Sequence, residues 1–405
     1  MTRTPGERWR APWACNPEAS RGRVHPERPS PTRTEFQRDR DRVIHSAAFR
    51  RLMHKTQVFL FHEGDHVRTR LTHTLEVSQI ARALARSLGL DEDLAEALAL
   101  SHDLGHPPFG HTGEEALDGC LGAFGGFDHN AQAFRIVTRL EDRYAAFPGL
   151  NLAWETLEGL AKHNGPLVAP DGSPLGRARA RGVPTAILDY DRERPLDLAH
   201  HASAEAQAAA IADDIAYDAH DLDDGLRAGM LELDDLAAVP FLAELLAEID
   251  HLHPGLPRTK RIHELTRRVI TRFVEDVVDE GRRRIAALAP ATAQDIRRAG
   301  RPVIAFSDDM ATAERSVKDF LFPQLYRHER LMAVRGQAEA VVRELFERFT
   351  ADPASLPEGW QAGLAGADDA KLARRAADYI AGMTDRFAVQ EHRRLFPHSP
   401  DLRLA

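Results

Sequence analysis

The chain has 405 residues, a formal net charge of −9 and only two cysteines. Proteins that coat nucleic acid by bulk electrostatics are usually basic, so the negative charge argues against that mode of binding without excluding a nucleic-acid partner, and local groups must bind any anionic ligand. Cys15 and Cys120 lie far apart in the sequence, which argues against a disulfide or a zinc knuckle and favours a reducing, cytoplasmic location. The sequence lacks an apolar run of the roughly 18 residues that a spanning helix needs, so we expect no membrane partner.

Apolar residues make up 43% of the chain, and long stretches are rich in Ala, Leu, Arg and Glu. Strand-like alternation is scarce, so we predict an all-α fold. We divide the chain into an Arg- and Pro-rich arm over 1–35, a helical core over 36–225, and a C-terminal helical region over 226–405 packed on that core. The arm is expected to be partly disordered, with residues 1–18 solvated.

The first predicted elements are a helix over 38–52 and a short strand or hairpin arm over 55–61, which Gly64 ends. A second helix is predicted over 72–88 and ends at Gly89. Its inward face is expected to consist of Leu75, Ile80, Leu84 and Leu88.

Asp91 is expected to cap a helix over 91–104, with His102 and Asp103 in its last turn. Residues 165–195 are rich in Gly, Pro and Arg and predict a surface excursion without a core element. A helix then begins at Ser203 and is expected to end near Asp221, before the run Asp223, Asp224 and Gly225. Further helices are predicted near 258–288, 308–349 and 368–393.

Residues 102–111 read His-Asp-Leu-Gly-His-Pro-Pro-Phe-Gly-His. Three imidazoles and a carboxylate separated by Gly and Pro cannot form the buried face of a regular helix, so this segment predicts a site. His73 lies on the preceding predicted helix, and Asp213 lies on a later one. Two imidazoles and two carboxylates form a mixed N/O set that suits Mn²⁺, Fe²⁺, Co²⁺, Zn²⁺ or Mg²⁺.

Asp213, Tyr217 and Asp221 stand four residues apart and therefore share one helical face. Asp214 is the adjacent competitor for a ligand position. It is turned about 100° away from that face on an ideal helix, so we choose Asp213.

Several longer blocks resemble the deoxyguanosine triphosphate triphosphohydrolase (dGTPase) family of the HD phosphohydrolase superfamily. The blocks span about residues 20–390 and lie at 36–42, 48–52, 55–58, 70–73, 102–111, 130–132, 211–217 and 382–387. The resemblance implies an HD-domain helical bundle over 36–225 with additional C-terminal helices. It also implies hydrolysis of a deoxynucleoside triphosphate, dGTP or several dNTPs, to the deoxynucleoside and inorganic tripolyphosphate.

The resemblance further implies a divalent metal ion, Mn, Mg, Co, Fe or Zn. Its ligands would be His73, His102, Asp103 and Asp213. His111 matches the family's catalytic histidine and Glu114 the glutamate that orients it. The alternative for Glu114 is a cap on a helix that starts near Thr112.

Arg70 precedes His73 by three residues, so on a helix it shares that face and can bind the triphosphate; the alternative is a plain surface arginine. His106 faces the phosphates or supports the tight turn. By the resemblance, Gln57, Tyr217 and Asp221 surround the sugar, although Tyr217 can also be a core aromatic. Asp385 is expected to support helix packing.

Two other functions remain open at this stage. The first is a nucleotide monophosphatase or phosphodiesterase of the same superfamily, and the second is a nucleotide sensor or a binder of single-stranded nucleic acid. The family resemblance also implies a homo-oligomer and, in some members, a nucleotide effector.

Overall fold

The computed structural model describes residues 9–58, 68–176, 178–400 and 402. Within these ranges the chain forms 18 α-helices and no strand, only isolated β-bridges, so the all-α prediction is confirmed. The described part of the predicted strand, residues 55–58, contains one bridge, between Thr56 and Thr69. The rest of that segment and Gly64 lie outside the described residues.

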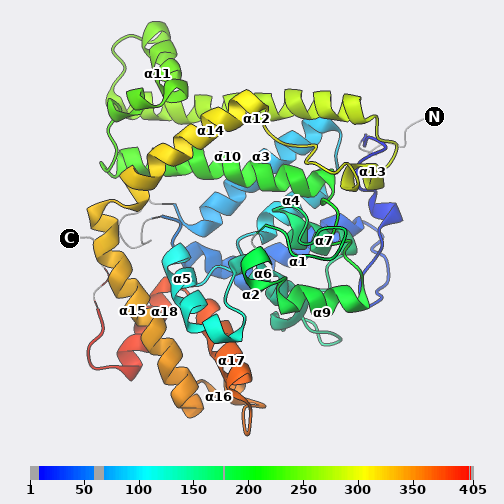
Figure 1. The fold of residues 1–405 in the computed structure, drawn as a ribbon, viewed down its shortest axis with the longest axis vertical. Helices are drawn as coiled ribbons and strands as arrows, with labels where there is room; N and C mark the ends of the chain where they lie inside the picture. The colour runs from blue at the N-terminus through cyan, green and yellow to red at the C-terminus, as the bar shows by residue number, and fades with distance from the viewer. Residues whose placement is uncertain (1–8, 59–67, 177, 401, 403–405) are drawn as a thin grey trace.

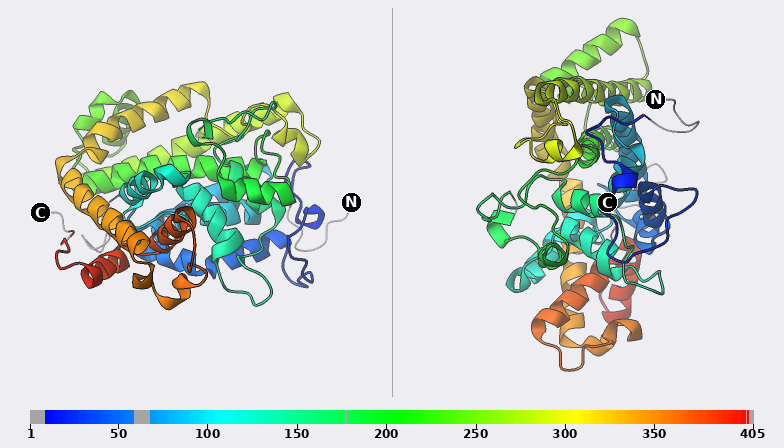
Figure 2. Two further views of the ribbon diagram at one scale, coloured as in Figure 1. Left: turned by 60° about the horizontal axis from the view of Figure 1, so that its bottom comes forward. Right: turned by 90° about the vertical axis from the view of Figure 1, so that its right-hand side faces the viewer.

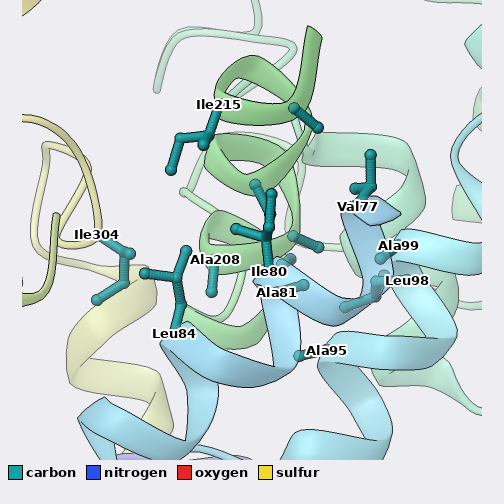
Figure 3. Close-up of a cluster of buried hydrophobic side chains, with 14 of the residues drawn as sticks. Val77, Ile80, Ala81, Leu84, Ala95, Leu98, Ala99, Ala208, Ile215 and Ile304 are labelled. Carbon is teal, nitrogen blue, oxygen red and sulfur yellow. The ribbon is translucent and has the colours of Figure 1, made fainter. Parts of the chain in front are cut away.

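Three packed helices form the centre of the molecule: α3 (Arg70–Leu88), α4 (Glu92–Ser101) and α10 (Ala204–Arg227). On their outer sides, α1 (Glu35–Ile44) packs on α4, and α12 (Arg258–Leu288) runs along α10 (Figure 1). Aliphatic side chains fill the seam between the central helices, as Figure 3 shows for Ile80, Leu98 and Ile215. Burial of this apolar surface is the main force that holds the helices together.

The end of α3 and the start of α4 follow from their sequences as predicted, but α4 ends at Ser101, three residues before the predicted end at 104, and His102 is its C-cap. Gly89 ends α3 in the left-handed conformation with φ 69°, which glycine adopts without steric cost. The Asp91 carboxylate caps α4 by accepting a hydrogen bond from the Leu94 N–H at 2.9 Å. The prediction was wrong for Leu75, which is 48% exposed. It lies about 140° around the helix from Ile80 and therefore faces away from the core.

Three predicted long helices are each divided into two α-helices, and in each case a new N-cap residue starts the second helix. The helix predicted over 38–52 is divided into α1 and α2 (Ala47–Arg51), because Ser46 caps α2. The stretch 308–349 is divided into α14 (Asp308–Leu321), a π-helical turn and α15 (Glu329–Ala351). The stretch 368–393 is divided into α17 (Asp369–Ala381) and α18 (Asp385–Leu395), with Thr384 as the cap of α18.

The predicted end of α10 near Asp221 was also wrong, because the helix continues to Arg227. Arg68 forms ion pairs with both Asp223 and Asp224 and so neutralises the acidic run within the helix. A Cβ at Gly225 would lie 2.7 Å from a methyl carbon of Leu231, so this glycine allows a close helix contact instead of ending the helix.

Two segments expected at the surface contribute to the core. The 165–195 region contains α8 (Ala178–Arg181) and α9 (Thr185–Glu193), and Ile187 of α9 is buried, which corrects the expectation that no core element lies there. Residues 9–18 are also ordered on the core, where the Cys15 N–H donates to Glu205 at 2.8 Å. Residues 1–8 lie outside the described part.

The buried apolar residues form two clusters. The larger one includes the central helices and extends to Leu325, so residues on both sides of position 225 contribute to it. The smaller one joins α5 (Gly110–Cys120) to α15, α17 and α18, which form the lower end of the molecule opposite α11 and α12 (Figures 1 and 2). The remaining helices are α6 (His129–Arg135), α7 (Trp154–Lys162), α11 (Pro240–Leu252), α13 (Ala293–Arg297) and α16 (Glu358–Gln361). Among the described helices, none combines the length and the apolar character needed to cross a membrane.

Candidate active site

A cavity of about 590 Å³ opens between α3, α10 and the 102–111 segment. Every predicted site residue lines it except Glu114 and Asp221. Glu114 contacts the cavity-lining His111, and Asp221 is fully buried. The fold thus brings together predicted site residues as far apart in the sequence as Gln57 and Tyr217.

Four proposed metal ligands converge at one wall of this cavity. Asp213 Oδ1 lies 2.9 Å from His73 Nε2 and 3.4 Å from His102 Nε2. Asp103 Oδ1 lies 3.3 Å from the same His102 nitrogen. The ligand atoms of His73, His102 and Asp103 all lie within 4.8 Å of one another, which is close enough for one ion to contact them together. We call these four residues the metal cluster.

The His102 ring is oriented by its own helix. His102 is the C-cap of α4, where the last carbonyl groups lack intrahelical partners, and its Nδ1 lies 2.6 Å from the Ala99 oxygen. The carbonyl can only accept, so Nδ1 carries a hydrogen and Nε2 faces the carboxylates. Burial alone would lower the pKa of His102, but Asp103 and Asp213 outweigh it and raise this pKa to about 10. The position strongly favours a positive charge.

The two neighbouring aspartates of α10 have different surroundings. Burial would raise the pKa of Asp213, but His102 and His73 hold it well below its usual range. Burial raises the pKa of Asp214 instead, although its carboxylate pairs with Lys318 at 2.9 Å. The helix phase predicted from the sequence therefore matches the geometry, with Asp213 facing the imidazoles.

Arg70 is not a surface arginine. It is 2% exposed, and its Nη1 donates to Asp103 Oδ2 at 2.9 Å. Gly110 makes room for it, because a Cβ at this left-handed glycine would lie 3.1 Å from Arg70 Nη2. Arg70 therefore both orients a metal-cluster carboxylate and lines the cavity.

The turn that carries the histidines is supported from the C-terminal helices. Asp385 Oδ1 accepts from the Phe109 N–H at 2.9 Å, and Asp385 Oδ2 accepts from the Thr56 N–H at 2.9 Å. The buried Lys55 ammonium donates to the His106 and Ala381 carbonyl oxygens. The supporting role expected of Asp385 thus extends to the active-site turn itself.

Glu114 connects two of the histidines that line the cavity. Its Oε2 lies 3.1 Å from His111 Nδ1, and its Oε1 lies 2.7 Å from His129 Nδ1. Burial would raise the pKa of Glu114, but the hydrogen bonds from His111 and His129 hold it far below its usual range. His106 stacks on His129 with ring centroids 3.9 Å apart, and its Nε2 lies 3.2 Å from Asp103 Oδ1. His106 therefore bridges the two histidine groups, and burial lowers its pKa well below 6.5.

The sugar-binding residues expected near the metal cluster also lie together. The Tyr217 and Tyr326 rings are 6.0 Å apart, and the Tyr326 hydroxyl donates to Asp221 Oδ2. Asp221 is fully buried, and its Oδ1 has no hydrogen-bond partner within the described residues. Burial raises the pKa of Asp221 to about 8 despite the Tyr326 hydrogen bond. We call Tyr217, Asp221 and Tyr326 the tyrosine cluster; Gln57 lines the same cavity.

Sequence reasoning missed three residues at the site: His129, Lys318 and Tyr326. His129 directly precedes the Asn-Ala-Gln block at 130–132, which was a usable signal. Lys318 lines the cavity from α14, and Tyr326 lies in the π-helical turn that follows it. Neither has a local sequence signal, because both reach the site only through long-range packing.

A second cavity of about 870 Å³ adjoins the first and shares His111, His129 and Asn130 with it. Its outer wall includes Leu175, Arg181 and Ile187 from the 165–195 region. This region, which matched no motif in the sequence, therefore forms part of the surroundings of the site.

Comparisons with known proteins agree with this architecture. The HD domain family matches residues 70–218, and the phosphohydrolase-associated domain family matches residues 304–394. A deoxyguanosinetriphosphate triphosphohydrolase-like protein of Azorhizobium caulinodans is 59% identical over 98% of this chain and 99% of its own length. Proteins of the same description from Brucella anthropi and Bradyrhizobium diazoefficiens are 59% and 57% identical, over 98% and 97% of this chain and 98% of their own lengths.

Proposed function

Because the chain belongs to the deoxyguanosine triphosphate triphosphohydrolase-like family of HD phosphohydrolases, we propose that it hydrolyses deoxynucleoside triphosphates in a metal-dependent reaction. The substrate is dGTP or several dNTPs, and the products are the deoxynucleoside and inorganic tripolyphosphate. The observation that carries the proposal is the convergence of two imidazoles and two carboxylates beside the His111–Glu114 pair in one cavity. A protein that only binds nucleotides would not need the His111–Glu114 pair beside the metal ligands.

The residues of the metal cluster suit a divalent ion. The buried His102 Nε2 has no hydrogen-bond partner in the described chain, although carboxylate oxygens lie 3.3 and 3.4 Å away. A cation among these atoms satisfies the lone pair and both negative charges. His73, His102, Asp103 and Asp213 would hold Mn, Mg, Co, Fe or Zn. When bound, the metal supplies positive charge that polarises the α-phosphate and orients a water molecule.

His111 is the proposed proton-transfer group. Its Nδ1 donates to Glu114, which fixes the tautomer and leaves Nε2 on the other side of the ring. In this arrangement, His111 gives a proton to the 5′-oxygen of the departing deoxynucleoside or takes one from the attacking water. Its side chain is 54% exposed, so a substrate can reach it from the cavity. His129 shares Glu114 and is the second candidate for this role.

The remaining polar groups suit the two ends of a nucleotide. Arg70 and Lys318 supply positive charge for the triphosphate, and His106 lies beside Arg70 at the same wall. The Tyr217 ring packs against C2′ and leaves no room for a ribose 2′-hydroxyl. Asp221 Oδ1, which is buried and unpartnered in the described chain, accepts from the sugar 3′-hydroxyl, and Gln57 lines the same end.

Product analysis tests the proposal. Metal-loaded protein is incubated with each of the four dNTPs, alone and mixed, and the products are separated by anion exchange. Equal amounts of deoxynucleoside and tripolyphosphate are expected. Release of orthophosphate, or of pyrophosphate with a monophosphate, contradicts the proposal and favours a phosphatase or diesterase; nucleotide binding without turnover favours a sensor. Faster turnover in the mixture supports the expected nucleotide effector, and native mass spectrometry tests the expected homo-oligomer.

A further inference from the structure

His220 is a buried histidine that touches the metal cluster from behind. It is 2% exposed and is not among the residues that line the described cavity. Its Nδ1 lies 3.1 Å from Nδ1 of His73, and its Nε2 lies 2.8 Å from Glu76 Oε2. Glu76 stands one turn after His73 on α3, so the three side chains form a chain of contacts that leads away from the cavity.

The contact with Glu76 determines where the hydrogens lie. Burial would raise the pKa of Glu76, but the hydrogen bond from His220 and the charge of Arg68 lower it to about 2, so this carboxylate only accepts. His220 Nε2 therefore carries a hydrogen. A neutral imidazole carries a single hydrogen, so with that hydrogen on Nε2 the His220 ring presents a lone pair at Nδ1, 3.1 Å from His73 Nδ1. The His73 Nδ1 must then donate to it, and the His73 Nε2 lone pair faces Asp213.

His73 needs such a partner because of its position in its helix. His102 stands at the end of α4 and uses the free carbonyl of Ala99. His73 stands in the first turn of α3, where the carbonyl of Thr69 already accepts from the His73 backbone N–H at 3.0 Å. In helix starts it is the N–H groups that lack partners, not the carbonyls. An acceptor for the His73 ring must therefore come from another helix, and α10 supplies it.

A salt bridge holds the far end of this chain of contacts. Arg68 Nε donates to Glu76 Oε2 at 3.0 Å, and the same guanidinium pairs with Asp223 of α10 at 2.8 Å. The Glu76 carboxylate is thus fixed between α3 and α10, although its side chain is 46% exposed. Its orientation is set by defined partners on both sides.

We propose that His220 and Glu76 are positioning residues that hold His73 with its hydrogen on Nδ1, so that its Nε2 is always available to the metal. The inference rests on the metal use of the proposed function. Partners of this kind on metal-binding histidines typically change metal affinity by about 10- to 100-fold.

Metal affinity of the full-length protein tests the proposal. Chelator-treated protein is titrated with Co²⁺, and binding is followed by visible absorption. The variant H220F fills the space but removes the acceptor, and we expect it to bind Co²⁺ about 10- to 100-fold more weakly. The variant H220N keeps an acceptor oxygen near the place of Nδ1 and is expected to stay within about threefold of the wild type. E76A is expected to weaken binding by about three- to tenfold, because water can replace its carboxylate.

The control is L222A, which removes packing from the same buried stretch of α10 without touching the metal cluster. We expect it to lower the unfolding midpoint and leave Co²⁺ affinity unchanged. Unchanged affinity in H220F overturns the proposal, as does an equal loss in L222A and H220F; if H220F does not fold, unchanged affinity in E76A overturns it. Wild-type protein that binds no metal overturns both this inference and the proposed function. Metal binding without tripolyphosphate release overturns only the function.

Discussion

The metal cluster and the tyrosine cluster lie one to two helical turns apart on α10, yet they are built in opposite ways. In the metal cluster, three of the four side chains also contact a group outside the cluster: His102 contacts Ala99, His73 contacts His220, and Asp103 contacts Arg70. In the tyrosine cluster, two rings surround a single buried carboxyl group that keeps one oxygen unpartnered in the described chain.

This difference shows how one cavity can serve two tasks. The charged groups of the metal cluster are already held in place by their hydrogen bonds and ion pairs. They can therefore stabilise charge on a reacting phosphate without first changing their positions. The two rings of the tyrosine cluster instead give the sugar pocket its shape, and the oxygen of Asp221 that is unpartnered in the described chain can accept a hydrogen bond from one hydroxyl group. We therefore expect substitutions in the metal cluster to abolish the reaction and substitutions in the tyrosine cluster to change substrate choice and stability.

The largest effect is expected from H102A or D103A. Each removes one of four proposed ligands, so metal and turnover should be lost together. Metal content by mass spectrometry and dNTP turnover are the measurements, with H111A as the control that keeps its metal. Either variant retaining both metal and activity would remove the metal assignment.

The second prediction compares neighbours on α10. D213N should lose metal and activity, because Asp213 lies 2.9 Å from His73 Nε2. D214N should keep its metal, because Asp214 pairs with Lys318 instead. The same metal assay measures both, and equal metal loss in the two variants would mean that the α10 geometry is misassigned.

The third prediction concerns proton transfer. H111A should lower kcat by about 10²-fold or more while metal and dNTP binding persist, as expected when a general acid or base is removed from an intact site. H129A serves as the comparison, because both histidines share Glu114. Unchanged kcat in H111A with a large loss in H129A would transfer the role to His129.

The four residues of the metal cluster were predicted from the family resemblance together with two local signals, and the fold brings all four together. The helix phase separated Asp213 from Asp214, and the motif at 102–111 placed two of the ligands within consecutive residues. The fold class and the helices α3, α4 and α12 were predictable from local patterns: apolar periodicity, Gly89 after α3 and the Asp91 cap of α4.

The tyrosine cluster was predictable only in part. Tyr217 and Asp221 share a helix, but Tyr326 comes from a π-helical turn 105 positions after Asp221, and only long-range packing brings it there. His220 was invisible for another reason: its role depends on which nitrogen carries a hydrogen, and that is set by Glu76 on a different helix. The helix breaks at Ser46 and 382–384 depend on caps inside otherwise periodic sequences.

The fourth prediction concerns sugar selectivity. If the Tyr217 ring blocks C2′, GTP should be a far poorer substrate than dGTP, and Y217A should narrow the ratio of their kcat/KM values by about tenfold or more. Y217F is the control, because it keeps the ring. An undiminished ratio in Y217A would show that other residues exclude the ribose.

The fifth prediction concerns stability rather than turnover: D221N should change its pH dependence. The pKa of Asp221 is raised from about 4 in an unfolded chain to about 8 in the folded protein, because burial disfavours its charge. Between these values the folded state keeps a proton that the unfolded state has released, so stability falls as pH rises and the loss is complete above about pH 8. This slope is at most about 1.4 kcal/mol per pH unit.

D221N cannot ionise, so its free energy of unfolding relative to wild type should rise from pH 5.5 to 7.5 in urea titrations. D142N, a substitution at an exposed aspartate, should run parallel to the wild type. If the free energy of unfolding of D221N also changes with pH as that of the wild type does, Asp221 is ionised in the folded protein. The tyrosine cluster would then stabilise a charge, as the metal cluster does.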